Sequence, residues 1–171
     1  SDRLCGVFNA AAAPEFKEKD KEFIRWIQQE IESLPIKVEY NCEITTLAEL
    51  TEDEIIIATG AKPRKLDVPG QEKAFEATEY LLGRKVGKDV AVIGGGLTGC
   101  EIAYDLVLKG KRPVIVEMAD DILKTKGLCM ANSSCMRDLL RYYEVPIYKN
   151  AKLLEIIENG IVIETAEKTI Q

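Results

Sequence analysis

Residues 90–117 read VAVIGGGLTGCEIAYDLVLKGKRPVIVE, and this stretch decides the fold. An apolar run at 90–93 leads into three glycines with the spacing GxGxxG, and an amphipathic helical pattern follows to about Lys109. A second apolar run at 114–116 ends on Glu117. Strand, glycine turn, helix, strand and acid follow one another in the order that a dinucleotide-binding βαβ unit needs.

The glycines of this motif have different expected roles. Gly94 permits the tight turn out of the strand, Gly96 lets a pyrophosphate approach the backbone, and Gly99 lets the helix pack close to the sheet. The first amides of the helix and its positive dipole end favour phosphate groups. The residues expected to cradle a pyrophosphate through backbone N–H groups are Gly94, Gly95, Gly96, Leu97 and Thr98.

Glu117 lies at about the spacing, roughly 20 residues on, at which an acid binds the adenosine ribose. Met118 is expected to border the adenine. A 2′-phosphate would be repelled by the Glu117 carboxylate and would need an arginine or lysine just beyond it. Residues 118–123 read MADDIL, with two aspartates and no basic residue, and the nearest cations are Lys124 and Lys126. The sequence therefore favours NADH over NADPH.

Length and composition exclude several classes of protein. The chain has 171 residues, of which 46% are apolar, so one ordinary domain or two small ones can form a core. The net charge is −6 and there is no basic stripe, which argues against a nucleic-acid partner. No apolar run approaches the roughly 20 residues of a membrane span, and no signal peptide is visible, so we expect a cytoplasmic protein.

The cysteines and the lack of histidine restrict the chemistry further. Five cysteines stand at positions 5, 42, 100, 129 and 135, an odd number without a CxxC pair. This pattern indicates reduced thiols and supports neither a zinc knuckle nor a dithiol redox site. Without histidine, acid–base catalysis and metal ligation by imidazole are excluded. We expect no catalytic residue and no metal site in this chain.

The half of the chain before the glycine motif reads as a helix followed by short strands. Residues 15–34 have apolar side chains at helical spacing, and Trp26 on this helix is expected to lie in a core. Strands are predicted at 36–40 and, more briefly, at 43–45. The run Ile55-Ile56-Ile57-Ala58 is predicted to be a buried strand.

The remaining pattern completes an α/β fold, a Rossmann-like doubly wound parallel sheet with a small antiparallel meander. A domain boundary is expected near residues 84–88. The other predicted elements are a helix at 77–82, a helix at 130–143, a strand at 146–148 and a meander at 152–157, 160–164 and 168–170 that turns at Asn159-Gly160. Such a domain usually needs one more buried strand at this point, so the sequence looks truncated at its C-terminus.

Two further strings resemble segments of the two-dinucleotide flavoprotein oxidoreductases, in which a smaller NAD(P)H-binding domain interrupts an FAD-binding domain. The string IATGAKP at residues 57–63 looks like the motif that closes the first flavin-domain segment. The opening SDRLCGVFNAAAAPEFK is most similar to the C-terminal region of the old-yellow-enzyme-related NADH:flavin oxidoreductases, the 2,4-dienoyl-CoA and 2-enoate reductases. Cys5 departs from that pattern, because it stands where the first glycine of a pair is expected.

The resemblance implies that residues 1–85 are a partial FAD-binding segment with a linker, the remnant of a flanking flavin domain, and that residues 86–171 are the NADH-binding domain. Thr59 and Gly60 would lie beside FAD in the full-length protein. Its partners would be the nicotinamide dinucleotide and the missing flavin and barrel domains of the same protein, and FMN and an iron–sulfur cluster are implied upstream as further cofactors. Hydride would pass from NADH to FAD, and electrons would pass through the cluster to FMN, which reduces an activated C=C bond.

Two other functions are weighed beside this one. The first is a non-catalytic ADP-binding or interaction domain of a related flavoprotein, because an intact glycine motif does not prove turnover. The second is a disulfide reductase, which lacks support without a paired cysteine motif.

Overall fold

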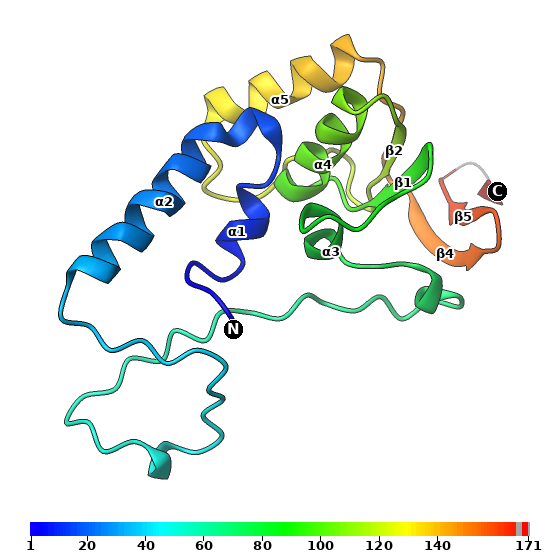
Figure 1. The fold of residues 1–171 in the computed structure, drawn as a ribbon. Helices are drawn as coiled ribbons and strands as arrows, with labels where there is room; N and C mark the ends of the chain where they lie inside the picture. The colour runs from blue at the N-terminus through cyan, green and yellow to red at the C-terminus, as the bar shows by residue number, and fades with distance from the viewer. Residues whose placement is uncertain (167–168, 171) are drawn as a thin grey trace.

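The computed structural model describes residues 1–166 and 169–170, and Figure 1 shows the arrangement of their helices and strands. Along the chain the elements are α1 (Phe8–Ala11), η1 (Glu15–Lys17), α2 (Glu18–Ser33), η2 (Leu47–Glu49), η3 (Gln71–Lys73), α3 (Ala77–Leu81), β1 (Asp89–Ile93), α4 (Leu97–Leu108), β2 (Arg112–Val116), α5 (Met130–Tyr142), β3 (Ile147–Tyr148), β4 (Lys152–Ile157), β5 (Gly160–Glu164) and β6 (Thr169–Ile170).

A parallel sheet of order β1-β2-β3 forms the centre of the second half of the chain. Two helical crossovers connect its strands, α4 between β1 and β2 and α5 between β2 and β3. Because side chains alternate along a strand, Val92 and Ile115 point toward the helices and pack with Leu106 and Leu140. This core confirms the predicted Rossmann-like α/β fold.

The antiparallel meander β4-β5-β6 is also confirmed, with the predicted turn before Gly160. It packs on the other side of the sheet, where Val116 meets Leu153 and Ile163 in a second buried cluster. The loop before η3 is bound to the meander, since Ile156 N donates to Pro69 O at 2.9 Å. Residue 168, which we placed in the last strand, lies outside the described residues.

The N-terminal helices pack beside α4 (Figure 1). Lys17 Nζ lies 2.7 Å from Glu101 Oε2, and both side chains are largely buried. The predicted helix over 15–34 is present as η1 and α2, but its apolar face is not a core. Trp26 is 52% exposed and stacks only on Phe23, with ring centroids 5.5 Å apart. Helical spacing identified the apolar face, and α1 covers part of it, since Ile24 is buried and the Phe23 ring lies 6.1 Å from the Phe8 ring, but Trp26 stays on its exposed side.

The connector before β1 is attached to α4 by a buried carboxylate. Asp105 is 1% exposed and accepts hydrogen bonds from the Tyr80 hydroxyl and from Lys109 Nζ, each at 2.6 Å. Burial, with the Asp105 carboxylate beside it, raises the pKa of Tyr80 above its usual value. The predicted helix at 77–82 is present as α3, and the hydrogen bond from Tyr80 to Asp105 attaches it to α4. The proposed domain boundary at residues 84–88 remains a prediction.

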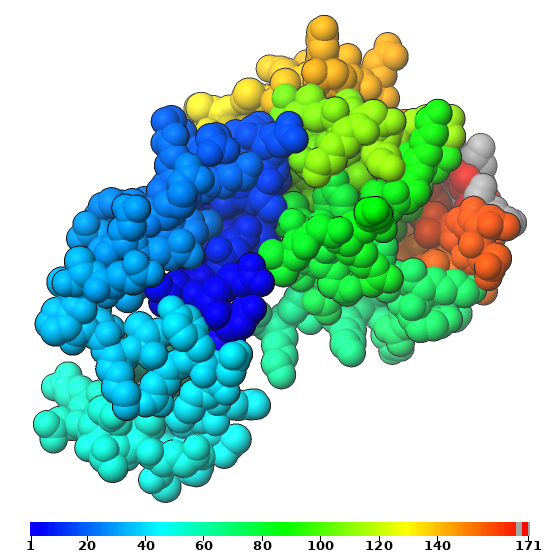
Figure 2. All heavy atoms as spheres, viewed as in Figure 1, coloured from blue at the N-terminus to red at the C-terminus, as the bar shows by residue number. Residues whose placement is uncertain are grey.

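The strands predicted at 36–40, 43–45 and 55–58 are wrong. The chain there is extended and exposed, and it forms the cyan lobe that hangs below α2 in Figure 2. Ile56 is 91% exposed and Ile57 is 73% exposed. A strand is stable only when a neighbouring strand pairs with its backbone groups, and none of the described residues supplies one here.

Among all the residues that the structure describes, no helix combines the length and apolarity needed to cross a membrane.

Candidate dinucleotide-binding site

The glycine turn connects the carboxyl end of β1 to the first turn of α4. Gly94 N donates to Val116 O at 2.8 Å, which fixes the start of the turn beside β2. α4 then begins at Leu97 with Gly96 as its N-cap, and no side chain caps the helix. Its first turn carries no acidic residue. The helix itself therefore places no side-chain anion at its first amides or its positive dipole end.

The fold itself requires three of the four glycines at this turn. Gly94 has a φ of 103°, a conformation that other residues rarely adopt. A Cβ on Gly95 would stand 2.6 Å from Ile122 Cγ2, and a Cβ on Gly99 would overlap the Gly94 carbonyl oxygen. Because Gly95 and Gly99 lack a Cβ, the helix, the turn and the following loop can approach one another this closely.

Gly96 is different, because nothing in the fold requires a glycine there. Its φ of −70° and ψ of −176° suit any residue. A Cβ at this position would meet no protein atom within 4 Å. The open space in front of the α4 N-terminus is thus available to a group that approaches the backbone from outside.

Glu117 lies at the end of β2 and reaches across to the glycine turn. Its Oε2 accepts the Gly95 N–H at 2.6 Å, and its Oε1 accepts the Ala119 N–H at 2.6 Å. The side chain is partly buried. Each carboxylate oxygen can accept a second hydrogen bond, so the side chain can still bind a ribose hydroxyl while it organises the turn.

The loop after Glu117 closes over the glycine turn, a contact that the sequence analysis missed. Leu123 N donates to Gly95 O at 2.7 Å, and the Ile122 side chain is buried against Gly95. Leu123 has a φ of 55°, which is unusual for a residue other than glycine. A leucine gives no sequence signal for such a backbone conformation, so only the tertiary structure reveals it.

The other predicted site residues fall into two groups. Leu97 and Thr98 lie on the first turn of α4, and Met118 is 73% exposed beside Glu117. The structure therefore brings these residues to the glycine turn. Thr59 and Gly60 lie instead in the exposed extended segment and make no hydrogen bond to the turn within the part of the chain that the structure describes.

Cations near the loop are already paired with its aspartates. Lys124 Nζ lies 2.5 Å from Asp120 Oδ1, and Arg137 Nη1 lies 2.9 Å from Asp121 Oδ2. Lys149 contacts the other oxygen of Asp121 at 3.4 Å. These ion pairs lower the positive charge that is available to bind a 2′-phosphate.

Comparison with known proteins identifies the chain. The sequence profile of the pyridine nucleotide-disulphide oxidoreductase family matches residues 7–171. The chain belongs to this family.

Two curated relatives and one solved structure are informative. Cinnamate reductase of Clostridium sporogenes is 35% identical over 166 residues, which cover 95% of this chain and 25% of the relative. NADH oxidase of Thermoanaerobacter brockii is 37% identical over 128 residues, or 70% of this chain and 20% of the relative. The structure of 2-naphthoyl-CoA reductase with 2-naphthoyl-CoA has a TM-score of 0.86 at 26% identity, covering 99% of this chain and 26% of that one.

Membership of this family makes the chain a pyridine nucleotide oxidoreductase sequence, and the family implies NAD(P)H and FAD as cofactors. The chain spans about a quarter of the length of cinnamate reductase and of 2-naphthoyl-CoA reductase. The structural likeness to 2-naphthoyl-CoA reductase extends over almost the whole chain. It includes the exposed, extended segment between α2 and η3.

All five cysteines of this oxidoreductase domain are free. Cys100 is fully buried on α4, and burial raises the pKa of its thiol to about 12. Cys129 is exposed at the N-cap of α5, where the backbone amides of Asn132 and Ala131 lower the pKa of its thiol. Cys5, which replaces an expected glycine, has a φ of 68°, a conformation that explains the expectation.

Alkylation should therefore discriminate sharply among these thiols. At pH 7.5 we expect iodoacetamide to modify Cys129 first, because its thiolate is stabilised and exposed, and to leave Cys100 unmodified. Mass spectrometry of peptides from a time course measures the order, with exposed Cys42 as the internal control. Modification of Cys100 in the folded chain at the rate of Cys42 would contradict the packing of α4 on the sheet.

Proposed function

We propose that this chain is the NADH-binding part of a flavin-dependent reductase, and that it delivers hydride from NADH to FAD for reduction of an activated C=C bond. The observation that carries the nucleotide site is Gly96. The fold explains the other glycines of the turn, whereas Gly96 is explained by a ligand that contacts the backbone in front of α4.

The chain's residues divide the binding of the dinucleotide between them. The Gly94 and Gly95 N–H groups are bonded to Val116 and Glu117, so the backbone amides from Gly96 to Thr98 and the helix dipole are offered to the pyrophosphate. Glu117 offers acceptor capacity to the adenosine ribose, and Met118 an exposed apolar surface to the adenine. When bound, NADH supplies the hydride and FAD accepts it, and the role of the protein is to bind and orient the two.

The preference for NADH over NADPH follows from charge. A 2′-phosphate beside Glu117 would meet a carboxylate, while the neighbouring cations Lys124 and Arg137 are occupied by Asp120 and Asp121. The name of one relative, an NADH oxidase, is consistent with this choice.

The flavin side of the proposal depends on the exposed segment. Residues 55–58 are apolar but have no partner strand among the described residues, and Gly60 has a φ of 74° with open space around it. A flavin domain of the complete protein would supply the missing neighbours, with Thr59 and Gly60 beside FAD. The names of cinnamate reductase and 2-naphthoyl-CoA reductase favour a conjugated carboxylate or thioester as the substrate class. FMN and an iron–sulfur cluster, which the family resemblance implies, would lie upstream in the full-length protein.

Calorimetric titration of the chain with NADH, NADPH and ADP tests the nucleotide site. We expect NADH to bind at least about tenfold more tightly than NADPH, since one unfavourable charge contact near a carboxylate costs on the order of 1.4 kcal/mol. Equal affinity for ADP and NADH would favour the alternative, a non-catalytic ADP-binding domain. Binding of none of the three would refute the proposed site.

A further inference from the structure

The glycine turn depends on the loop 118–123 for its shape. Gly95 is held on one side by Glu117, which accepts its N–H, and on the other by Leu123, which donates to its carbonyl. Ile122 packs so closely that a Cβ on Gly95 would collide with it. Any movement of this loop therefore moves the backbone that precedes the α4 N-terminus.

The loop does not hold this conformation by itself. Leu123 adopts a left-handed backbone conformation that a branched side chain rarely adopts. The neighbouring residues Asp120 and Lys124 are exposed and paired mainly with each other. Contacts with other elements keep the loop against the turn: Ile122 and Leu123 are buried in the core, and Asn150 N donates to Ala119 O at 2.8 Å.

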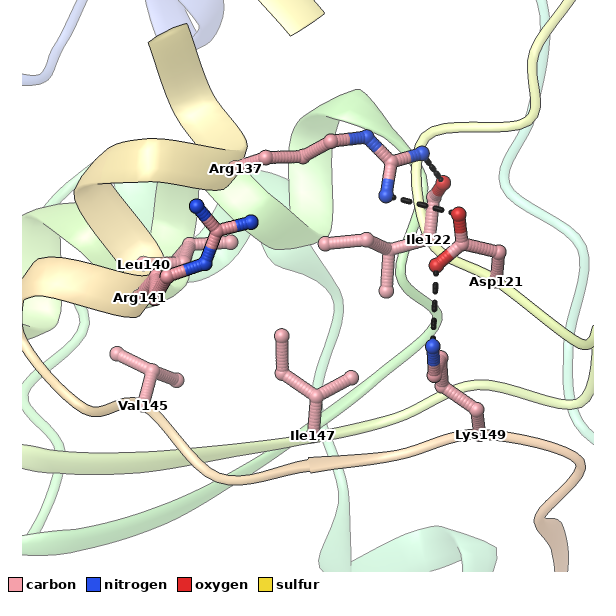
Figure 3. Close-up of a pocket in the computed structure, with 8 residues that line it drawn as sticks. All are labelled: Asp121, Ile122, Arg137, Leu140, Arg141, Val145, Ile147 and Lys149. Atoms are coloured by element: carbon pink, nitrogen blue, oxygen red, sulfur yellow. Dashed lines mark hydrogen bonds and ion pairs between the residues drawn. The ribbon is translucent and has the colours of Figure 1, made fainter. Parts of the chain in front are cut away.

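Arg137 on α5 adds a polar contact to the centre of the loop (Figure 3). Its Nη2 donates to the Ile122 carbonyl, and its Nη1 pairs with Asp121 Oδ2 at 2.9 Å. Lys149, from the chain after β3, holds the other oxygen of Asp121 at 3.4 Å. One planar guanidinium thus bonds two adjacent residues of the loop, a geometry that a lysine ammonium does not reproduce.

Arg137 is itself held in place by α5. The residues around it on this helix, Met136 and Leu140, are buried in the core between the helices and the sheet. The Arg137 side chain is only 33% exposed, whereas Arg141, one turn further on, is 79% exposed and pairs with Asp138 on its own helix. The two arginines line the same cavity of about 280 Å³, but only Arg137 contacts the loop.

From this geometry, and resting on the proposed function, we propose that Arg137 is a positioning residue of the dinucleotide site. It closes the loop 118–123 on Gly95, so that the amides before α4 and the Glu117 carboxylate are arranged for the adenosine half of NADH. Arg137 does not touch the nucleotide. Removal of the Arg137 guanidinium should weaken the binding of NADH and the binding of ADP to the same extent, because both ligands contain the adenosine half.

Three variants test this role in the whole chain. R137M keeps the apolar stem and removes the hydrogen bonds, and we expect the Kd for NADH and for ADP to rise about tenfold. R137K should lose nearly as much, because one ammonium cannot bond both loop residues. The control R141M removes an arginine from the same cavity without freeing the loop, and its Kd values should stay within about twofold of wild type.

The titration separates positioning from a loss of folding. Partial unfolding lowers the number of binding sites at constant Kd, whereas a displaced loop raises the Kd at an unchanged number of sites. Equal Kd values for R137M and R141M would overturn the proposal.

Hydrogen exchange decides the same question without a nucleotide. Faster exchange at the Gly95 and Leu123 amides in R137M, but not in R141M, supports loop closure by Arg137, and equal exchange overturns it. If wild-type chain binds neither NADH nor ADP, the proposed function fails, and this exchange measurement still tests Arg137.

Discussion

Replacing Gly99 with alanine is expected to destabilise the chain by about 3 kcal/mol, toward the upper end of the usual effect of overpacking. The added methyl would overlap the Gly94 carbonyl oxygen and stand 3.1 Å from the Gly94 carbonyl carbon. This obstacle is backbone, so no side-chain rotation relieves it. α4 must move away from the turn as a unit, and NADH binding should weaken together with stability.

Gly96→Ala is the matched control for this substitution. At Gly96 a methyl meets no protein atom and the backbone is in a conformation that alanine adopts freely, so stability should be unchanged or rise by up to about 1 kcal/mol. Its NADH affinity should nevertheless fall, because the methyl occupies the space in front of α4. Urea unfolding followed by circular dichroism gives the stabilities, and calorimetry gives the affinities.

The two glycine variants therefore test different claims. Wild-type stability in Gly99→Ala would contradict the close packing of α4 on the turn. Wild-type NADH affinity in Gly96→Ala would place the pyrophosphate elsewhere, even if the fold is correct.

Glu117→Ala is expected to weaken NADH binding by about 2 kcal/mol, or roughly 30-fold, within the usual range for charge-assisted hydrogen bonds. The variant loses the acceptor for the ribose, and it also releases the Gly95 and Ala119 amides that the carboxylate holds at 2.6 Å. Glu117→Gln should bind NADH with an affinity between those of the wild type and Glu117→Ala, because its amide offers only one acceptor oxygen. Calorimetric titration with NADH measures the series.

Asp120→Asn is the control, because its exposed carboxylate lies three residues further on and pairs only with Lys124 in the described contacts. Its affinity for NADH should remain close to wild type. The double variant Glu117→Ala with Met118→Arg should improve NADPH relative to NADH, since it exchanges a repulsive charge for an attractive one. Tight NADH binding by Glu117→Ala, or no change in the cofactor ratio, would contradict this placement of the ribose.

The Rossmann-like part of the fold was predictable from local patterns. The strands at β1 and β2, the helices α4 and α5 and the turn before Gly160 have short-range signals that agree with one another, namely apolar runs, glycine spacing and helical periodicity. Their partners lie within this chain, so each predicted strand finds a neighbour and each apolar helix face finds a core.

The segment between α2 and η3 was predicted wrongly for the opposite reason. Ile55, Ile56 and Ile57 are typical of a buried strand, yet the backbone groups of a strand need an adjacent strand and its side chains need a cover. The described residues offer neither, so Ile56 remains 91% exposed. The composition of a segment indicates that its side chains can be buried, but their burial depends on which other elements pack beside the segment.

The site shows the same division. By itself the sequence determined the glycine turn, the helix that starts at Leu97 and the acid at Glu117, because the close backbone approach and the strand–helix–strand order restrict residue types at fixed spacing. Only the tertiary structure decided that Glu117 holds two backbone amides, that Leu123 bends in a left-handed conformation onto Gly95, and that Arg137 fixes the loop. The longest of these contacts joins Leu123 to Gly95, 28 positions apart (123 − 95), and no local pattern encodes which groups meet when a sheet and two helices pack.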